Sequence, residues 1–137
     1  TICGLGDAGA HVATICDASY PTFLLTHWGR DRKRGNGLPL EHLVSKQTFK
    51  TARAFGLYDR GILARGYRAD INMVDFATLS VARPELVYDL PAGGRRFIQR
   101  AIGYEHTFVG GVEVLHQGEH TGALPGELIR GSQRSPV

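Results

Sequence analysis

The 137-residue sequence has few cysteines, a single methionine and no long apolar run. Its two cysteines, Cys3 and Cys16, are too few for a disulfide framework, and nothing suggests secretion, so we expect a cytoplasmic protein. No apolar run approaches about 20 residues, so we expect no membrane span. The sequence does not begin with its one methionine, Met73, and it starts inside an apparent strand. We therefore expect a piece of a longer protein.

Positive charge is modest and local. The net charge is +3, and much of the basic excess lies in the segment 30–34. Nucleic-acid binding calls for a basic face with interleaved aromatic residues or a recognised module, and neither is present. We expect a solvated basic loop and no nucleic-acid partner. With 42% hydrophobic residues, the length suits one ordinary globular unit with a real core.

The first dozen residues carry the strongest functional signal. The apolar run 1–5 predicts a buried strand, and Asp7 follows it among small residues, ahead of His11. A strand that ends in this way delivers a carboxylate to the rim of a sheet. The alternative is an ordinary turn, in which Asp and Gly are common for their turn chemistry alone. Without further context, the residues favour the turn.

One glycine motif overlaps this stretch. Gly4, Gly6 and Gly9 spell the G-x-G-x-x-G of dinucleotide-binding folds, which needs a full strand before it and an acid about 20 residues on. Only three residues precede Gly4, and Asp7 would face the pyrophosphate. Asp31 has roughly the right spacing, but it lies in the basic loop. Nucleotide binding through Gly4–Gly9 therefore stays a weak alternative.

A second motif lies near the C-terminus. Residues 116–120 spell H-x-x-E-H, a zinc-peptidase signature that needs a helix to place both histidines on one face. Residues 112–115 alternate like a strand, and Gly118 is a poor helix residue. We interpret this match as chance.

The remaining pattern predicts helices followed by strands, which is an α/β chain. Helices are expected over 21–28 and 39–55, the second with Pro39 in its first turn. Residues 78–91 are expected to be irregular. Strands are expected over 71–76, 97–104, 105–109 and 112–116, with Gly110-Gly111 as a hairpin turn.

Six stretches in order resemble the C-terminal part of the N-acyl-D-amino-acid deacylases (D-aminoacylases), a branch of the metal-dependent amidohydrolase superfamily. The element of glycine, tyrosine, any residue, alanine and aspartate at 66–70 recurs across that superfamily. Each motif is modest by itself, and their order is specific. The stretches are 4–11, 38–41, 56–61, 66–75, 89–96 and 118–126.

The resemblance implies the C-terminal end of a (β/α)8 barrel over residues 1–60, with its last strand at 1–6. An accessory β-sandwich layer with a loose C-terminal tail would occupy 61–137. Asp7 matches the family's strand-eight aspartate, which is catalytic and lies at the metal. It takes a proton from the attacking water and passes it to the leaving amine. When bound, zinc supplies a nucleophile at neutral pH and polarises the amide carbonyl.

The resemblance also places three further residues near the mouth of the barrel. His11 lies close enough to join the mouth, and His27 and Arg30 would flank the pocket of a small N-acyl amino acid. Arg30 would pair with the substrate carboxylate. From spacing alone, the alternative for His27 and Trp28 is a half-buried aromatic edge.

Several parts of the family's metal site are missing from this sequence. The early His-x-His pair, the later histidine ligands and the bridging ligand would all precede residue 1. We expect zinc in the full-length parent, no zinc in this fragment and no activity from the fragment alone. A partial barrel exposes apolar surface and a sheet edge, which predicts self-association. The alternative of another class is a non-catalytic β module that binds or assembles through its edges.

Overall fold

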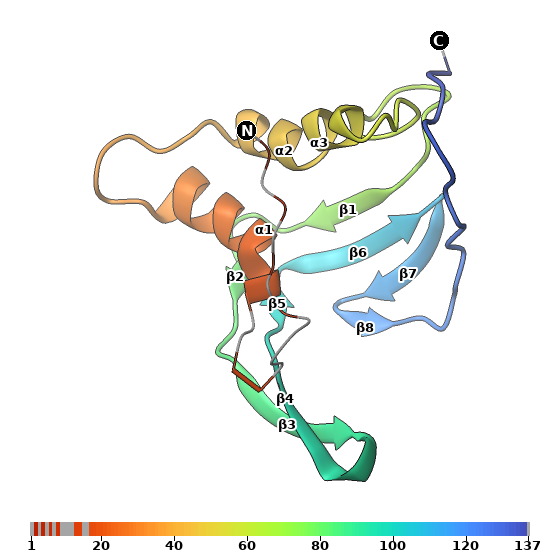
Figure 1. Cartoon of the computed structure of the whole chain (residues 1–137). Coiled ribbons are helices and arrows are strands. Elements are labelled where there is room, and N and C mark those ends of the chain that lie inside the picture. The colour runs from red at the N-terminus through yellow and green to blue at the C-terminus, as the bar shows by residue number, and fades with distance from the viewer. Residues whose placement is uncertain are drawn as a thin grey trace.

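The computed structural model describes residues 17–136, together with residues 2, 4, 6, 8, 13 and 14. Helices come first along the chain and strands follow, as Figure 1 shows. This order confirms the predicted mixed α/β class. The helices are η1 (Asp17–Ser19), α1 (Tyr20–Phe23), η2 (Leu24–Asp31), α2 (Leu40–Gln47) and α3 (Phe49–Ala54).

The first predicted helix is present, but it is longer and changes form. Pro21 lies in the first turn of α1, and the chain continues into η2, which is a π-helix. Thr22 and Thr26, one turn apart, are the buried residues of this segment. The Thr22 hydroxyl lies 2.9 Å from the Tyr104 hydroxyl. The buried side of this segment therefore carries threonines, which the apolar character of residues 20–28 does not predict.

The second predicted helix is interrupted at Thr48. Helix α2 ends one residue before it and α3 begins one residue after it, because Thr48 has φ −116° and ψ −86°. The Thr48 hydroxyl donates to the Val44 carbonyl at 2.8 Å, a side-chain bond of the kind that bends helices. Leu43 and Ala52 are buried as the pattern predicts, whereas Val44 and Phe55 are exposed.

The main element of the second half of the chain is a four-stranded antiparallel sheet. Gly110 and Gly111 have φ of 58° and 81° and turn β6 into β7, which confirms the predicted hairpin. The sheet order is β1-β6-β7-β8, formed by β1 (Ile71–Val74), β6 (Tyr104–Val109), β7 (Val112–His116) and β8 (Glu119–His120).

Two further strand pairs lie outside this sheet. Strand β2 (Ser80–Val81) pairs with β5 (Ala101–Ile102), and β3 (Glu85–Leu90) pairs with β4 (Gly94–Ile98). The β3–β4 hairpin turns through η3 (Pro91–Gly93) and projects away from the central sheet (Figure 1).

Two strand predictions are wrong in this region. Residues 78–91 contain β2 and β3, although they were expected to be irregular. Strand β3 is exposed along most of its length, so it lacks the buried side that produces an alternating pattern. The strand expected over 97–104 is divided among β4, β5 and β6.

The core is small within the described part of the chain. Leu43 and Leu79 are fully buried, and Ala52 is 8% exposed. Gly103 has φ 94°, and a Cβ there would lie 2.8 Å from the Leu79 Cα, so only glycine fits. Large apolar side chains remain exposed, among them Phe55, Leu63, Tyr88, Leu124 and Leu128.

The C-terminal segment is tied to the helical segment. The Gln133 N–H donates to the Gly56 carbonyl at 2.8 Å, and the Tyr58 N–H donates to the Gln133 carbonyl at 3.1 Å. These two bonds hold Gln133 in place, and the loose tail stays a prediction. The boundary between 1–60 and 61–137 stays a prediction, and these bonds cross it. None of the helices in the described part combines the length and hydropathy that a membrane span requires.

Candidate functional site

Two of the four predicted site residues can be placed. Asp7 and His11 lie outside the described residues, as do other members of the Gly4–Gly9 stretch, so their roles stay predictions. His27 and Arg30 both lie on the π-helix η2. An i→i+5 helix is rare and is found mostly as short segments at functional sites.

His27 belongs to a small aromatic cluster. Its half-buried ring stacks on Phe23, with centroids 5.0 Å apart and planes 5° from parallel. Trp28 meets the same ring edge-on at 5.4 Å, and the Arg32 guanidinium lies 4.2 Å from the Trp28 ring centroid. This arrangement is the half-buried aromatic edge, and the predicted contact of His27 with substrate stays a prediction.

Arg30 fastens η2 to the connection between β1 and β2. A guanidinium has five N–H donors, and all five of Arg30 point at oxygens of this chain. Asp31 accepts two of them, at 2.7 and 3.0 Å. The carbonyl oxygens of Phe76, Ala77 and Leu79 accept the other three.

The electrostatics of Arg30 follow from these contacts. The hydrogen bonds between the two side chains lower the pKa of Asp31 and raise the pKa of Arg30. The guanidinium also lies 5.5 Å from the Phe76 ring centroid. Pairing of Arg30 with a substrate carboxylate stays a prediction, and it would require Arg30 to release one of its present partners.

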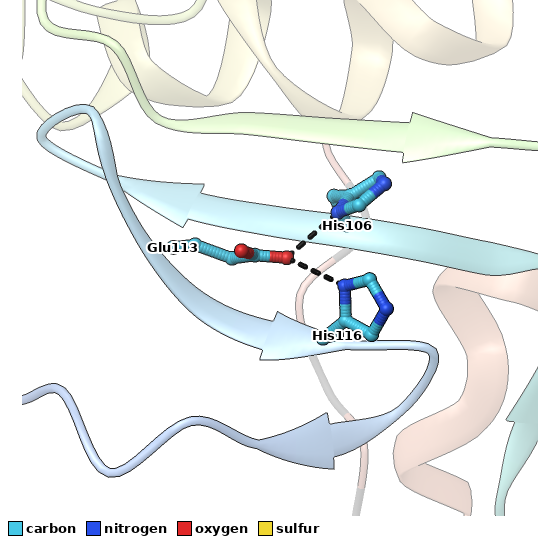
Figure 2. Close-up of side chains that lie close together, drawn as sticks. All are labelled: His106, Glu113 and His116. Atoms are coloured by element: carbon cyan, nitrogen blue, oxygen red, sulfur yellow. Dashed lines mark hydrogen bonds and ion pairs between the residues drawn. The ribbon is translucent and has the colours of Figure 1, made fainter.

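A second polar cluster lies on the central sheet. Glu113 Oε1 is 2.7 Å from His106 Nδ1 and 3.0 Å from His116 Nδ1, and Figure 2 shows the carboxylate directed at both rings. The three potential ligand atoms lie within 4.8 Å of one another. Within the described part of the chain, this is the one group of His, Cys, Asp or Glu side chains in which three ligand atoms converge so closely.

A β-bulge brings these side chains to one face. His106 on β6 and His116 on β7 are direct cross-strand partners. Glu113 is three residues before His116, so in a regular strand it would point to the opposite face. The register shifts opposite Thr107 and Phe108 and leaves Val114 as the extra residue of β7. That extra residue returns Glu113 to the face of the two histidines.

The cluster is partly exposed to solvent, and its histidines lower the pKa of its carboxyl group. The side chains of His106 and Glu113 are 30% and 34% exposed, and that of His116 is 56% exposed. Hydrogen bonds lower the pKa of Glu113, the one from His106 more than the one from His116. Two imidazoles and a carboxylate form a ligand set that suits zinc and related divalent ions.

This cluster was not predicted from the sequence. His116 was considered only within H-x-x-E-H, and the structure places His116 and His120 on successive strands joined by a turn. The zinc-peptidase geometry is therefore excluded. Counting outward from the Gly110-Gly111 turn in regular register would pair His106 with Leu115, so the bulge hides the true partner.

Comparison with known proteins identifies the family. Residues 1–115 match the profile described as the amidohydrolase family. A D-aminoacylase from Alcaligenes xylosoxydans xylosoxydans is 35% identical over 107 residues, which cover 77% of this chain and 19% of the relative. An N-acyl-D-glutamate deacylase from the same organism is 34% identical over 102 residues, covering 74% of this chain and 19% of the relative.

A solved structure gives the same result. A crystal structure of a D-aminoacylase, described as defining a novel subset of amidohydrolases, aligns with a TM-score of 0.57 at 32% identity. The alignment covers 75% of this chain and 19% of that structure. The chain thus matches only about a fifth of the length of these relatives. The predicted resemblance is confirmed: the chain belongs to the amidohydrolase family, in its D-aminoacylase branch.

Proposed function

We propose that this chain is part of an enzyme that hydrolyses the amide bond of N-acyl-D-amino acids or similar linear amides. The observation that carries the proposal is the amidohydrolase match over residues 1–115. The names of three relatives support the substrate class: a D-aminoacylase, an N-acyl-D-glutamate deacylase and an N-acyl-D-aspartate deacylase. The third is 33% identical over 105 residues.

The proposed architecture follows the family. Residues 1–60 would close a (β/α)8 barrel, and 61–137 would form the accessory β-sandwich layer. The helix-then-sheet order of the chain supports this arrangement. The contacts of Arg30 with the β1–β2 connection would keep the two parts in a fixed relation. In a barrel enzyme, the loops at the C-terminal ends of the strands carry the chemistry.

Asp7 is the proposed catalytic residue. Its carboxylate would accept a proton from the attacking water and return it to the leaving amine, which makes it both general base and general acid. His11 and His27 would flank the substrate, and Arg30 would fix the position of the segment that carries His27.

The family implies a zinc ion beside Asp7. Within the described part of residues 1–60, no group of three metal ligands converges. Asp7 and His11 lie outside the described residues, so we propose that Asp7 joins further ligands from elsewhere in the longer protein. When bound, zinc supplies a nucleophile at neutral pH.

Enantiomer discrimination tests the proposal. The longest open reading frame that contains this chain is expressed and incubated with N-acetyl-D-amino acids and, as the matched control, with their L-enantiomers. Release of free amino acid from the D-substrates, and much less from the L-substrates, is expected. The 137-residue chain alone should release none. Failure of the longer protein to hydrolyse any D-substrate would contradict the proposed function.

A further inference from the structure

We propose that His106, Glu113 and His116 form a binding site for one divalent transition-metal ion on the β6–β7 hairpin. The site does not rest on the proposed deacylase activity, and it revises the expectation that the chain alone binds no zinc. The proposal stands on the convergence of the three ligand atoms and on the bulge that produces it.

The spacing is close to what a metal requires. Ligands bonded to a tetrahedral zinc ion at about 2.0–2.1 Å lie roughly 3.3 Å from one another. The two contacts to Glu113 Oε1 are 2.7 and 3.0 Å, so each must open by a few tenths of an ångström. His116 is the most exposed of the three, so a small rotation of its side chain can open its own contact, and a small shift of the Glu113 carboxylate can open the contact with His106.

The present hydrogen bonds and a metal use the same atoms. Each imidazole Nδ1 needs a hydrogen to donate to the carboxylate, whereas a metal ligand offers a lone pair at that nitrogen. Binding would therefore displace these hydrogen bonds and shift each ring to the tautomer with its hydrogen on Nε2. The fourth tetrahedral position would face solvent and hold water. Two imidazoles with one carboxylate favour zinc, copper or nickel over magnesium and calcium.

Strand pairing fixes the backbone positions of two ligand residues before any ion arrives. His106 and His116 are paired across adjacent strands, with ring centroids 4.8 Å apart. The ring of Phe108 packs beside His106 at 6.0 Å, and Met73 of β1 lies opposite His106 in the sheet. Ligands on paired strands are more precisely held than ligands on loops. A bound ion would cross-link β6 to β7.

Zinc titration of the chelator-treated full chain tests the site. Calorimetry should show one Zn²⁺ per chain, and imidazole NMR signals of His106 and His116 should shift while that of His42 does not. Glu113→Gln and His116→Gln should each weaken binding about tenfold or more, a loss typical of sites that depend on each ligand. His120→Gln, on the neighbouring strand β8, is the matched control and should keep the parent affinity.

Two further measurements distinguish loss of this site from loss of the fold or of the deacylase chemistry. Asp7→Asn should still bind one Zn²⁺, so failure of the deacylase proposal would leave this result untouched. Circular dichroism and thermal melts must show that Glu113→Gln, which keeps the side-chain shape, is folded. Absence of binding at about 1 mM Zn²⁺ would overturn the site, because such an affinity supplies only about 4 kcal/mol. Unchanged affinity in folded Glu113→Gln and His116→Gln would overturn it as well.

Discussion

The Arg30 contacts on η2 and the His106–Glu113–His116 cluster on β6–β7 are two polar groupings of opposite kind. In both, a partly exposed cationic or imidazole side chain lowers the pKa of a carboxyl group. The five N–H donors of Arg30 contact five oxygen atoms of its own chain, so each donor has an acceptor. In the sheet cluster, two nitrogens share one oxygen of Glu113. A side chain whose hydrogen-bond donors are all used, such as Arg30, holds neighbouring segments together. Potential ligand atoms that converge and have few other partners can instead bind an ion.

The two groupings also differ in their relation to the core. Arg30 donates to the carbonyl of Leu79, which is fully buried. The sheet cluster is open to solvent at His116. Changes near Arg30 should therefore alter the stability of the fold, and changes at the sheet cluster should mainly alter binding.

The largest effect is expected from Leu79→Ala. Removing a fully buried leucine side chain costs about 2–5 kcal/mol of unfolding free energy through lost burial and the cavity that remains. Urea unfolding followed by circular dichroism measures the loss. The matched control is Leu63→Ala, since Leu63 is 83% exposed and its change should stay within about 0.5 kcal/mol. Equal losses in the two variants would show that Leu79 is not core.

Arg30→Met should have the next largest effect on stability. The three backbone carbonyls and Asp31 would lose their donor, and the melting temperature should fall by roughly 5 °C. Arg34→Met, in the exposed loop that follows, is the control and should melt like the parent chain. Zinc affinity should be the same in both variants. If Arg30→Met melted at the temperature of the parent chain, the proposed stabilising role of Arg30 would be wrong.

The pH dependence of stability should carry a smaller contribution from Glu113. Because the folded protein holds the pKa of Glu113 below its ordinary value of 4.5, the unfolded chain binds the proton more readily. The contribution is therefore present above that value and is lost as the pH falls through the lower pKa of the folded state. The effect is a melting-temperature difference of about 1–2 °C because the pair is partly exposed.

Melting curves of the metal-free chain and of Glu113→Gln, recorded between about pH 3 and pH 6, measure this contribution. The difference between the two should shrink toward the acid end. Glu105→Gln, an exposed change on β6, should follow the parent chain throughout. A difference that grows with acidity would contradict the sign.

The smallest effect is expected from Arg96→Met in the β3–β4 hairpin. Arg96 and Asp89 form a bidentate ion pair with N···O distances of 2.6 and 2.7 Å, but both side chains are more than 40% exposed. Exposed ion pairs contribute little, so the melting temperature should change by about 1 °C or less. A fall in melting temperature as large as that of Arg30→Met would mean that neither the exposure of an arginine nor the number of its hydrogen bonds decides its contribution to stability.

The sequence predicts the parts of the fold that have a regular pattern. The Gly110-Gly111 hairpin follows from its turn residues, and the burial of Leu43 and Ala52 follows from helical spacing. The break at Thr48 and the strand β3 were missed, since one depends on a side-chain bond to Val44 and the other has little buried surface.

The sites are harder to predict, for physical reasons. The resemblance predicts that Arg30 binds the substrate, which stays a prediction, and only the fold shows that its donors contact Asp31 and distant carbonyls. The convergence of Glu113 with His106 depends on a one-residue register shift. Such a shift leaves no mark in residue spacing.

The most direct test of the proposed catalysis is the turnover of N-acetyl-D-amino acids by the longer protein with Asp7 and with Asp7→Asn, at matched metal content. Loss of a positioned general acid–base group should lower kcat by about 10²–10⁴-fold. Circular dichroism should show the same fold in both proteins. Unchanged turnover in the folded, metal-matched variant would contradict the assignment of Asp7 as the catalytic residue.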